Sequence, residues 1–319
     1  MRKGSLEYWP HRRAKKQMPR QRSVPSVAKP MFLNFVAFKA GMTHVTMIDN
    51  TESPAKGTEV ARAATVLEIP KVYVYGLRFY KKGYAYKQVY GEVFDTAMAA
   101  KVGIKKTKHT LPSFKEKISE FTDVSALAYL DASNLGFGNK RVMRFELHIG
   151  GSTSSEKLEF AEKYLGKELK ILDFAKQGEY VDTTSISKGK GWAGVVKRYG
   201  VATQYRKATG KGRHVGTLGP WHPAKVMFGV PQAGHMGYNY RTEMNKHILK
   251  LGSQGDANSI NPNGGFLNYG IVKNDYMVLD GSIPGPSKRL VRLRKAIRMA
   301  EKVREPQLIY ISTTSKQGA

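Results

Sequence analysis

The sequence predicts a mainly β fold that carries an inserted α/β region and long basic extensions. Three observations support this prediction. Short apolar runs rich in β-branched and aromatic residues, most of them bounded by Gly or Pro, recur along the chain. Helical periodicity is confined mostly to residues 95–175. Basic residues gather in three segments that flank this near-neutral region, so a β-rich core, expected to be a small barrel, would hold both the insertion and the extensions.

The overall composition restricts the class of protein. The chain has 319 residues, of which 53 are Lys or Arg and 25 are Asp or Glu, so its net charge is +28 and its pI is near 10.0. At roughly 150 residues per domain, this length corresponds to about two domains, or to one domain with large insertions. A positive charge this large repels itself unless an anionic partner compensates it. The composition therefore favours a nucleic acid or an anionic membrane surface over a small-molecule substrate.

The absence of cysteine and the hydropathy of the chain exclude further classes of protein. The chain has no Cys, which excludes disulfides and Cys-based zinc sites. It has no run of 18 apolar residues, so we expect no membrane span. The first 30 residues have no apolar stretch of the kind that a secretory signal needs. They are rich in Arg, as a transit peptide would be, but their prolines and bulky aromatic residues weigh against that alternative.

Residues 1–30 predict an extended basic arm. Nine Lys and Arg residues accompany a single acid, Glu7, and four prolines exclude a continuous helix. Tyr8, Trp9 and His11 stand among the basic residues, and aromatic rings can stack on unpaired bases while arginines bind phosphates. We therefore interpret the segment as an RNA-binding arm. The alternative is a solvated tail that cannot fold alone.

Strand and helix signals alternate after the arm. Residues 32–38 form an apolar run and residues 72–80 are rich in β-branched and aromatic residues, so both are predicted strands. Ser113 and Glu116 have the spacing of a capping box, which predicts a helix that begins there. The apolar face of that helix would hold Phe114, Ile118 and Phe121.

A second strand–helix pair completes the α/β region. Residues 142–149 alternate between apolar and polar side chains, which predicts a strand with one buried face. Thr153 and Glu156 again have capping-box spacing and predict a peripheral helix. The expected buried residues are Met143, Phe145, Leu147 and Ile149 of the strand and Leu158, Ala161 and Leu165 of the helix.

The second basic segment spans residues 188–250. It holds twelve Lys and Arg residues, one acid (Glu243), four of the eight histidines and eleven of the 32 glycines. Residues 197–231 have little periodicity, and so long a stretch without secondary structure is usually functional or disordered. Its glycines would let the backbone approach phosphates closely. Trp221 lies in mid-segment between prolines, which predicts a rigid tip that presses into RNA; the alternative is a tryptophan packed on its own domain.

The C-terminal part contains two further predicted strands, at residues 271–279 and 308–311. Between them, residues 288–304 form the third basic segment, with eight Lys and Arg residues and one acid, Glu301. Its loose helical or mixed apolar pattern leaves two alternatives open. The cations could bind phosphates, or they could form a solvated face.

Enzyme and cofactor motifs are absent from the sequence. A Gly-x-Gly-x-x-Gly run occurs at residues 189–194, but no acid follows about 20 positions later. The Gly-Lys pair at residues 210–211 is followed by Gly212, and Tyr205 occupies the position where a P-loop has its first glycine. The histidines of the second basic segment lie among cations, a setting that would repel a metal ion. We therefore expect no enzyme activity, no cofactor and no metal site.

Several motifs together resemble the L-three family of large-subunit ribosomal proteins, in its archaeal and eukaryotic branch. The strongest is Ser-Lys-Gly-Lys-Gly-Trp-Ala-Gly-Val-Val-Lys-Arg at residues 187–198, followed by Gly-Pro-Trp-His-Pro-Ala at 219–224 and Gln-Ala-Gly-His-Met-Gly-Tyr at 232–238. Further matches lie at residues 2–6, 39–43, 241–246 and 281–286. The matches extend over most of the chain, and residues 61–175 are the least diagnostic part.

The resemblance implies a specific fold and role. The family has a six-stranded translation-protein-type β-barrel at the surface of the large subunit, and its long basic extensions penetrate the rRNA. Members bind near the 3′ end of 23S-type rRNA, help to nucleate subunit assembly, and direct the central loop toward the peptidyl transferase centre without being the catalyst. Trp221 matches the tryptophan at the tip of that loop. Neighbouring large-subunit proteins and 23S-type rRNA would be the partners, and any structural Mg²⁺ would be held through the rRNA.

Two positions depart from modified residues of the family. Thr209 aligns with a histidine that some eukaryotic members modify, and His235 aligns with a glutamine that some bacterial members modify. Neither modification is therefore expected in this chain.

The expected domain organisation follows from these observations. Residues 1–30 would be the arm, residues 31–60 and 176–319 the barrel domain with the 188–250 extension, and residues 61–175 the inserted α/β subdomain. The expected rRNA-binding residues are Arg2, Lys3, Trp9, Arg12, Arg13, Lys15, Lys16, Arg20, Arg22, Lys188, Lys190, Trp192, Lys197, Arg198, Arg206, Lys207, Lys211, Arg213, His214, Trp221, His222, His235, Arg241, Lys246, Lys288 and Arg289.

Two other functions would also suit a basic chain of this kind. A chromatin-type architectural protein would favour duplex DNA over rRNA. An RNA-modification factor would need a carboxylate or nucleophile cluster within the basic segments, and the sequence contains none there.

Overall fold

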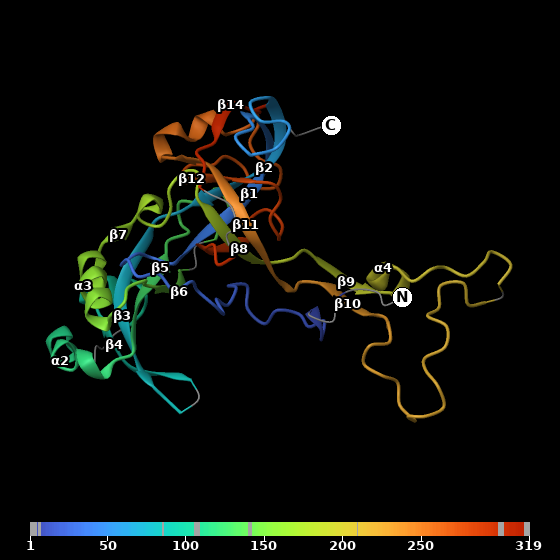
Figure 1. Ribbon diagram of the computed structural model, residues 1–319, viewed down its shortest axis with the longest axis horizontal. Helices are drawn as coiled ribbons and strands as arrows, with labels where there is room; N and C mark the ends of the chain where they lie inside the picture. Colours follow the sequence, from blue (N-terminus) through green and yellow to red (C-terminus); the bar gives the residue numbers. More distant parts are fainter. Residues whose placement is uncertain are drawn as a thin grey trace. The chain divides into compact units, whose positions relative to one another are not determined.

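The computed structural model describes residues 5, 8–84, 86–104, 109–139, 142–208, 210–298 and 303–315 (Figure 1). The chain divides into two compact units. Unit 1 combines Met1–Gln17 with Ile186–Arg241, and unit 2 combines Met18–Ser185 with Thr242–Ala319. Strands make up most of the regular structure, so the prediction of a mainly β fold is confirmed.

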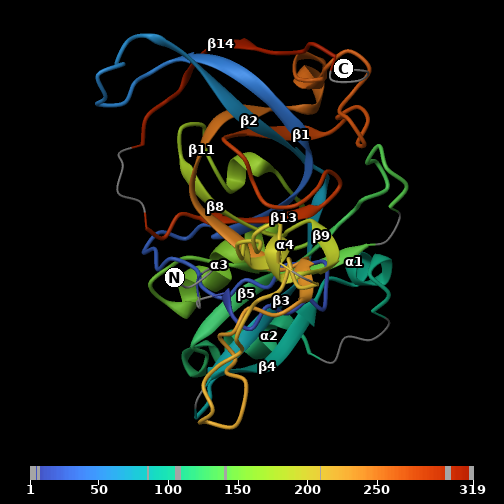
Figure 2. The same ribbon diagram turned by 90° about the vertical axis from the view of Figure 1, so that its right-hand side faces the viewer.

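The larger sheet has seven antiparallel strands in the order β13-β8-β11-β12-β2-β1-β14. Because β1 also pairs with β13, the first six strands of this order close into a ring of pairings. Figure 2 shows β1 and β2 running side by side as a long, curved ribbon. The strands are β1 (Asn34–Ile48), β2 (Glu59–Ile69), β8 (Tyr180–Ile186), β11 (Tyr240–Gly252), β12 (Asp275–Asp280), β13 (Leu290–Lys295) and β14 (Gln307–Ile311).

β1 is long enough to join three neighbours. Its first residues pair with β13, its last residues pair with β14, and most of its length pairs with β2. The register with β2 shifts between Lys39 and Gly41, which marks a bulge where the strand bends. A Cβ at Gly41 would lie 2.5 Å from the ring of Phe266. Glycine is therefore required at the bend so that the loop carrying Phe266 can pack against it.

The second sheet has the strand order β4-β3-β5-β6, with the short β7 paired to β3. Helix α3 packs on β5, and α1 contacts β3. The strands are β3 (Val72–Lys82), β4 (Lys87–Phe94), β5 (Asp123–Leu130), β6 (Met143–His148) and β7 (Glu168–Leu169). The helices are α1 (Thr96–Lys101), α2 (Leu111–Lys115), α3 (Ser154–Tyr164) and the 3₁₀ turns η2 (Ile118–Glu120) and η3 (Ile171–Asp173), with η4 (Gln254–Ser259) preceding β12.

One continuous apolar core underlies both sheets of unit 2. Its aromatic contacts join segments that are far apart in sequence. Phe32 contacts Phe160 of α3 at 5.0 Å between ring centroids, and Phe35 of β1 stacks on Phe174 at 5.7 Å. Residues 61–69 belong to β2, which pairs with β1 and β12, so the second sheet begins at Val72.

All five predicted strands are present, with shifted ends. They correspond to parts of β1, β3, β6, β12 and β14. The helix predicted after Thr153 is confirmed as α3, because Thr153 Oγ1 accepts a hydrogen bond from the backbone N–H of Glu156 at 3.4 Å. Leu158 and Ala161 are buried on its inner face, as the periodicity predicts.

The helix predicted to begin at Ser113 is wrong in its start and length. α2 is capped at Thr110, spans only Leu111–Lys115 and gives way to the turn η2. Pro112 accounts for the earlier start, because proline is favoured in the first turn of a helix and disfavoured in its interior. The Ser113 hydroxyl donates to the Thr110 carbonyl at 2.8 Å instead of capping the helix.

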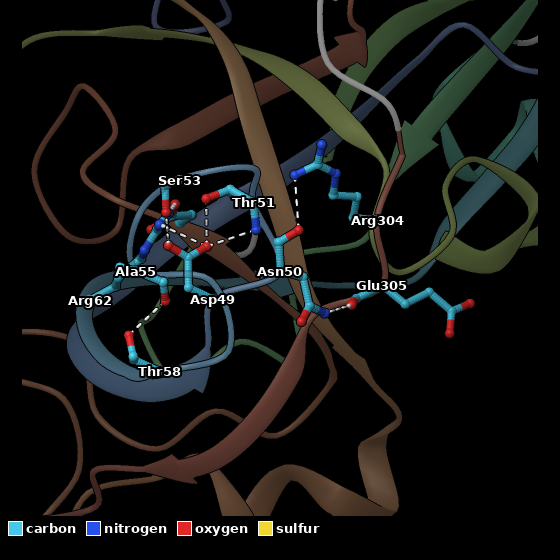
Figure 3. A network of polar contacts seen from close by, with 10 residues as sticks. Asp49, Asn50, Thr51, Ser53, Ala55, Thr58, Arg62, Arg304 and Glu305 are labelled. Atoms are coloured by element: carbon cyan, nitrogen blue, oxygen red, sulfur yellow. Dashed lines mark hydrogen bonds and ion pairs between the residues drawn. The ribbon is translucent and has the colours of Figure 1, made fainter.

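The loop between β1 and β2 is organised by Asp49 (Figure 3). Its carboxylate accepts hydrogen bonds from the backbone N–H of Thr51 at 2.9 Å, from the Thr51 hydroxyl at 2.7 Å and from the Ser53 hydroxyl at 2.9 Å. Arg62 lies 4.0 Å from the same carboxylate. The bonds from Thr51 and Ser53, aided by Arg62, lower the pKa of Asp49 to about 2 from 3.8.

The lowered pKa of Asp49 predicts an acid-dependent stability. A carboxyl group whose pKa is lower in the folded state contributes its stabilisation fully above about pH 3.8 and loses it as the pH falls toward about 2. Urea midpoints measured between pH 5 and pH 2 should therefore fall more steeply for the wild type than for Asp49→Asn. Equal slopes for the two proteins would contradict this role of the carboxylate.

Candidate nucleic-acid interface

Unit 1 contains most of the uncompensated charge. Its sequence has sixteen Lys and Arg residues and one acid, Glu7, so it carries +15 of the chain's +28. Glu7 lies outside the described residues, so the described part of unit 1 has no carboxylate side chain. The ion pairs recorded among the described residues all lie in unit 2. The cations of unit 1 therefore depend on an external anion for compensation.

A two-stranded ribbon forms the base of a long loop in unit 1. β9 (Gly189–Ala193) pairs with β10 (Gly234–Gly237), and Trp192 lies opposite His235. A short helix, α4 (Val195–Tyr199), follows β9 and ends at Gly200 with a φ of +65°. Gly237 has a φ of +76°, and a Cβ there would lie 2.1 Å from the Lys188 carbonyl oxygen. Glycine is therefore necessary where the two strands approach.

Arg198 closes the base of the loop from inside. Its Nε donates to the His235 carbonyl at 3.0 Å, and its Nη1 donates to the Gln232 carbonyl at 2.8 Å. A Cβ at Gly234 would lie 2.8 Å from Arg198 Nη1, so the glycine makes room for the guanidinium. Arg198, which the sequence identified as a phosphate-binding residue, thus holds the two ends of the loop together.

An aromatic cluster organises the N-terminal part of unit 1. Trp9 is half-buried, and its ring centroid lies 4.9 Å from His11, 5.7 Å from Tyr199 and 6.0 Å from Phe228. Desolvation, together with the nearby positive charges of Arg198 and Arg241, lowers the pKa of His11. The sequence led us to expect that Trp9 stacks on bases, but part of its ring surface is instead covered by His11, Tyr199 and Phe228.

Hydrogen bonds fix the backbone of the arm while its cations stay exposed. Ala14 N–H donates to the Tyr238 carbonyl at 2.9 Å, and Asn239 Nδ2 donates to the Arg12 carbonyl at 2.8 Å. The guanidinium of Arg241 lies over the ring of Tyr8 at 4.5 Å. The exposed cations of this part of the arm are Arg12, Arg13, Lys15 and Lys16.

Residues 200–233, hereafter the long loop, contain neither helix nor strand in their described part. Figure 1 shows the loop running from α4 as an open trace and returning to β10. Trp221 is 88% exposed, and its one ring contact among the described residues is with His222, at 6.4 Å between ring centroids. The loop's exposed predicted residues are Arg206, Lys207, Lys211, Arg213, His214, Trp221 and His222.

The set of rRNA-binding residues predicted from the sequence omitted several exposed side chains of the long loop. Tyr205 is 77% exposed and Phe228 is 71% exposed, and Lys225 is exposed as well. All three belong to the same aperiodic, cation-rich stretch, so their position in it was the signal that could have identified them.

The remaining predicted residues lie in varied surroundings. Lys188, Lys190, Trp192 and Lys197 are exposed near the base of the long loop, and His235 is half-buried on β10. In unit 2, Arg20, Arg22 and Lys288 are exposed, Arg289 is half-buried, and Lys246 forms an ion pair with Glu243 at 2.8 Å. Arg2, Lys3 and Thr209 lie outside the described residues.

Part of the third basic segment forms β13 (Leu290–Lys295), and the two arginines of this strand are used internally. Arg292 and Arg294 of β13 are both buried. Arg292 donates to the carbonyls of Pro19 and Glu146, and Arg294 forms an ion pair with Asp182 at 2.9 Å. These two cations are therefore neither solvated nor available to phosphates.

The described part of the chain contains no group of three or more His, Asp or Glu side chains that could hold a metal ion. Within the same residues, none of the helices is long and apolar enough to span a bilayer.

Comparisons with known proteins give consistent matches along the chain. The family model described as Ribosomal protein L3 matches residues 1–126 and 96–318. Large ribosomal subunit protein uL3 of Methanothermobacter thermautotrophicus is 43% identical over 329 residues, which cover 99% of this chain and 98% of the relative. The uL3 proteins of Methanococcus maripaludis strain C6 and of Methanocaldococcus jannaschii are 44% and 43% identical, and each alignment covers 99% of this chain and 97% of the relative.

Proposed function

Since the chain belongs to the ribosomal protein L3 family, in its archaeal type, we propose that it is a constituent of the large ribosomal subunit and that unit 1 binds rRNA. The observation that carries this proposal is the charge of unit 1, where sixteen cations accompany one acid and the long loop is exposed. A folded RNA supplies closely spaced phosphates, and binding them releases counterions. The family is a family of structural ribosomal proteins rather than of enzymes.

The exposed aromatic side chains favour RNA over duplex DNA. Trp192, Tyr205, Trp221 and Phe228 are all more than two-thirds exposed and lie among cations. Such rings stack on the unpaired bases that a folded RNA offers in its loops and bulges, whereas a DNA duplex keeps its bases stacked. The chromatin-type alternative is therefore less well supported. An RNA-modification activity lacks the carboxylate cluster that it would need within the described part of unit 1.

The finer assignments are proposals that rest on the family. The chain would bind near the 3′ end of 23S-type rRNA, help to nucleate assembly, contact neighbouring large-subunit proteins and work in the cytoplasm. The long loop would reach toward the peptidyl transferase centre with Trp221 at its tip. Mg²⁺ would take part only through the rRNA. The ring of pairings that β1 and β13 complete supports assigning β1, β2, β8, β11, β12 and β13 to the six-stranded translation-protein-type barrel.

The proposed binding mode is carried by the exposed cations named above. Residues 1–30 and the part of residues 188–250 that precedes β11 would be the RNA-binding extensions of the barrel domain. The α/β region from Val72 to residue 175 would be the inserted subdomain, because residues 61–69, which the sequence placed in it, belong to β2. The side chains of Arg198 and Trp9 would act by holding the long loop and the arm in place, because both make contacts within unit 1.

Binding of the full-length chain to rRNA tests the proposal. We expect 23S-type rRNA to be bound more tightly than duplex DNA at matched salt, with a log–log salt slope near −7 if about ten phosphates are contacted. In cells, the chain should co-sediment with the large subunit and remain bound through a high-salt wash. Equal affinity for the two nucleic acids, or release from the subunit at modest salt, would contradict the proposal.

A further inference from the structure

The β3–β4 hairpin extends beyond the sheet to which it belongs. β3 pairs with β5 no further than Tyr80 opposite Asp123, whereas its pairing with β4 continues to Lys82 opposite Lys87. Figure 1 shows the end of this hairpin projecting past the neighbouring elements of the sheet. We call residues 81–84, 86 and 87 the hairpin tip. None of the described residues of the tip is buried, so it contributes no side chain to the core.

The tip presents two tyrosines on a defined turn. Gly83 N–H donates to the Tyr86 carbonyl at 3.1 Å, and a Cβ at Gly83 would lie 2.4 Å from that oxygen, so the turn requires glycine. Tyr84 is fully exposed, and Tyr86 is 85% exposed. Packing against the described residues does not account for two aromatic side chains, two positions apart, that are this exposed, and exposed large apolar groups can mark interaction sites.

Lysines flank the two tyrosines in the sequence. Lys82 has no ion pair among the described residues. Lys81 pairs with Glu120 at 2.9 Å and Lys87 pairs with Asp123 at 2.6 Å, but the two lysine side chains are 48% and 55% exposed. Ion pairs this exposed are weak, so both ammonium groups can also approach an external phosphate. The tip itself contains no acidic residue.

We propose that the hairpin tip is a second rRNA-binding element, in which Tyr84 and Tyr86 stack on unpaired bases and Lys82 binds the adjoining phosphate. The inference rests on the proposed function, and it extends RNA contact to a part of unit 2 that is otherwise near-neutral. Two aromatic rings with lysines on either side in the sequence match the chemistry of single-stranded RNA, which offers a flat base and a phosphate at each nucleotide. The lysines Lys81, Lys82 and Lys87 beside the tyrosines favour RNA over a protein partner, because lysine is depleted at protein–protein interfaces.

The test uses the full-length chain and 23S-type rRNA transcribed in vitro. The double variant Tyr84→Ala/Tyr86→Ala should bind at least about ten-fold more weakly, because each ring loses its stacking on a base. Tyr84→Phe/Tyr86→Phe should retain wild-type affinity, since the rings remain. Tyr310→Ala is the matched control, because Tyr310 is a 51% exposed tyrosine on β14 with no lysine beside it. Lys82→Gln should reduce the salt slope by about 0.7.

Hydroxyl-radical footprinting distinguishes the tip from unit 1. The alanine double variant should lose one protected patch of unpaired nucleotides and keep the protections made by the arm and the long loop. If the wild type binds rRNA and the alanine double variant has the same affinity and the same footprint, this inference is overturned and the proposed function is left intact. A wild type that fails to bind rRNA would overturn both. Normal rRNA binding with loss of a neighbouring ribosomal protein on reconstitution would overturn the inference in favour of a protein contact.

Discussion

Replacing Asp182 with alanine is expected to lower the free energy of unfolding of unit 2 by about 3–5 kcal/mol, the usual cost of removing one partner from a buried ion pair. Asp182 of β8 is completely buried and lies directly opposite Arg294 of β13. Its Oδ2 accepts from Arg294 Nε at 3.0 Å and lies 2.9 Å from Nη2, while its Oδ1 accepts from the Asn245 N–H at 3.0 Å.

The alanine variant would leave a buried guanidinium without its counter-ion. Among the described residues, Arg294 would retain its bonds to the carbonyl and hydroxyl of Ser23, at 3.0 and 2.7 Å, and no carboxylate. The N–H of Asn245 would also lose its acceptor, at a residue whose φ of +54° holds it in the left-handed region. One substitution therefore disturbs β8, β11, β13 and the segment around Ser23 together.

A double-mutant cycle separates the ion pair from simple cavity formation. Asp182→Ala/Arg294→Met removes both charges and should be more stable than Asp182→Ala alone by about 1–3 kcal/mol, within the range of coupling energies for residues in contact. Urea unfolding should be followed by far-UV circular dichroism, because Trp9, Trp192 and Trp221 all belong to unit 1 and their fluorescence does not report on unit 2. Additive effects of the two single substitutions would show that the pair is not coupled.

The buried arginines of β13 also show where reasoning from sequence fails. In residues 291–294, apolar and charged side chains alternate, a pattern that is typical of a strand with one solvated face. In the structure that polar face is covered, because Arg292 and Arg294 donate to the carbonyls of Pro19 and Ser23. The covering segment lies about 270 residues away in the sequence, and no local pattern indicates that it returns to this strand.

Local signals, by contrast, were sufficient where the structure itself is local. α3 was predictable because its cap and its buried face lie within one short segment of chain. The aperiodic nature of the long loop was predictable for the same reason. The base of that loop was not, because β9 and β10 pair across more than 40 residues, and Arg198 reads in the sequence as one more cation of a basic run.

In the candidate interface, too, some features could be predicted from the sequence and others depend on the fold. Composition alone located the charge of unit 1, because an excess of cations with one acid does not depend on the fold. Which of the predicted rRNA-binding side chains are exposed, and which pack inside the protein, could be learned only from the fold. Trp221 and Trp9 both stand among basic residues in the sequence, yet Trp221 is exposed and Trp9 packs against Tyr199 and Phe228.

Neutralising the cations of the long loop is expected to have the largest effect on rRNA binding. The variant Arg206→Gln/Lys207→Gln/Lys211→Gln/Arg213→Gln removes four exposed charges from a segment with no acidic neighbour. If each contacts one phosphate, the salt slope should become shallower by about 3, and affinity near 0.15 M salt should fall by about two orders of magnitude. Filter binding of 23S-type rRNA over a range of salt concentrations measures both quantities.

A charge-matched control decides whether position or net charge produces the effect. Lys56→Gln/Lys163→Gln/Lys167→Gln/Lys176→Gln removes the same four charges from exposed positions of unit 2. If the loop contacts phosphates directly, this control should keep the wild-type slope, because counterions are released only where a cation meets a phosphate. Equal losses in the two variants would mean that the long-range field of the +28 charge governs binding, and the loop would then not be a site of direct contact.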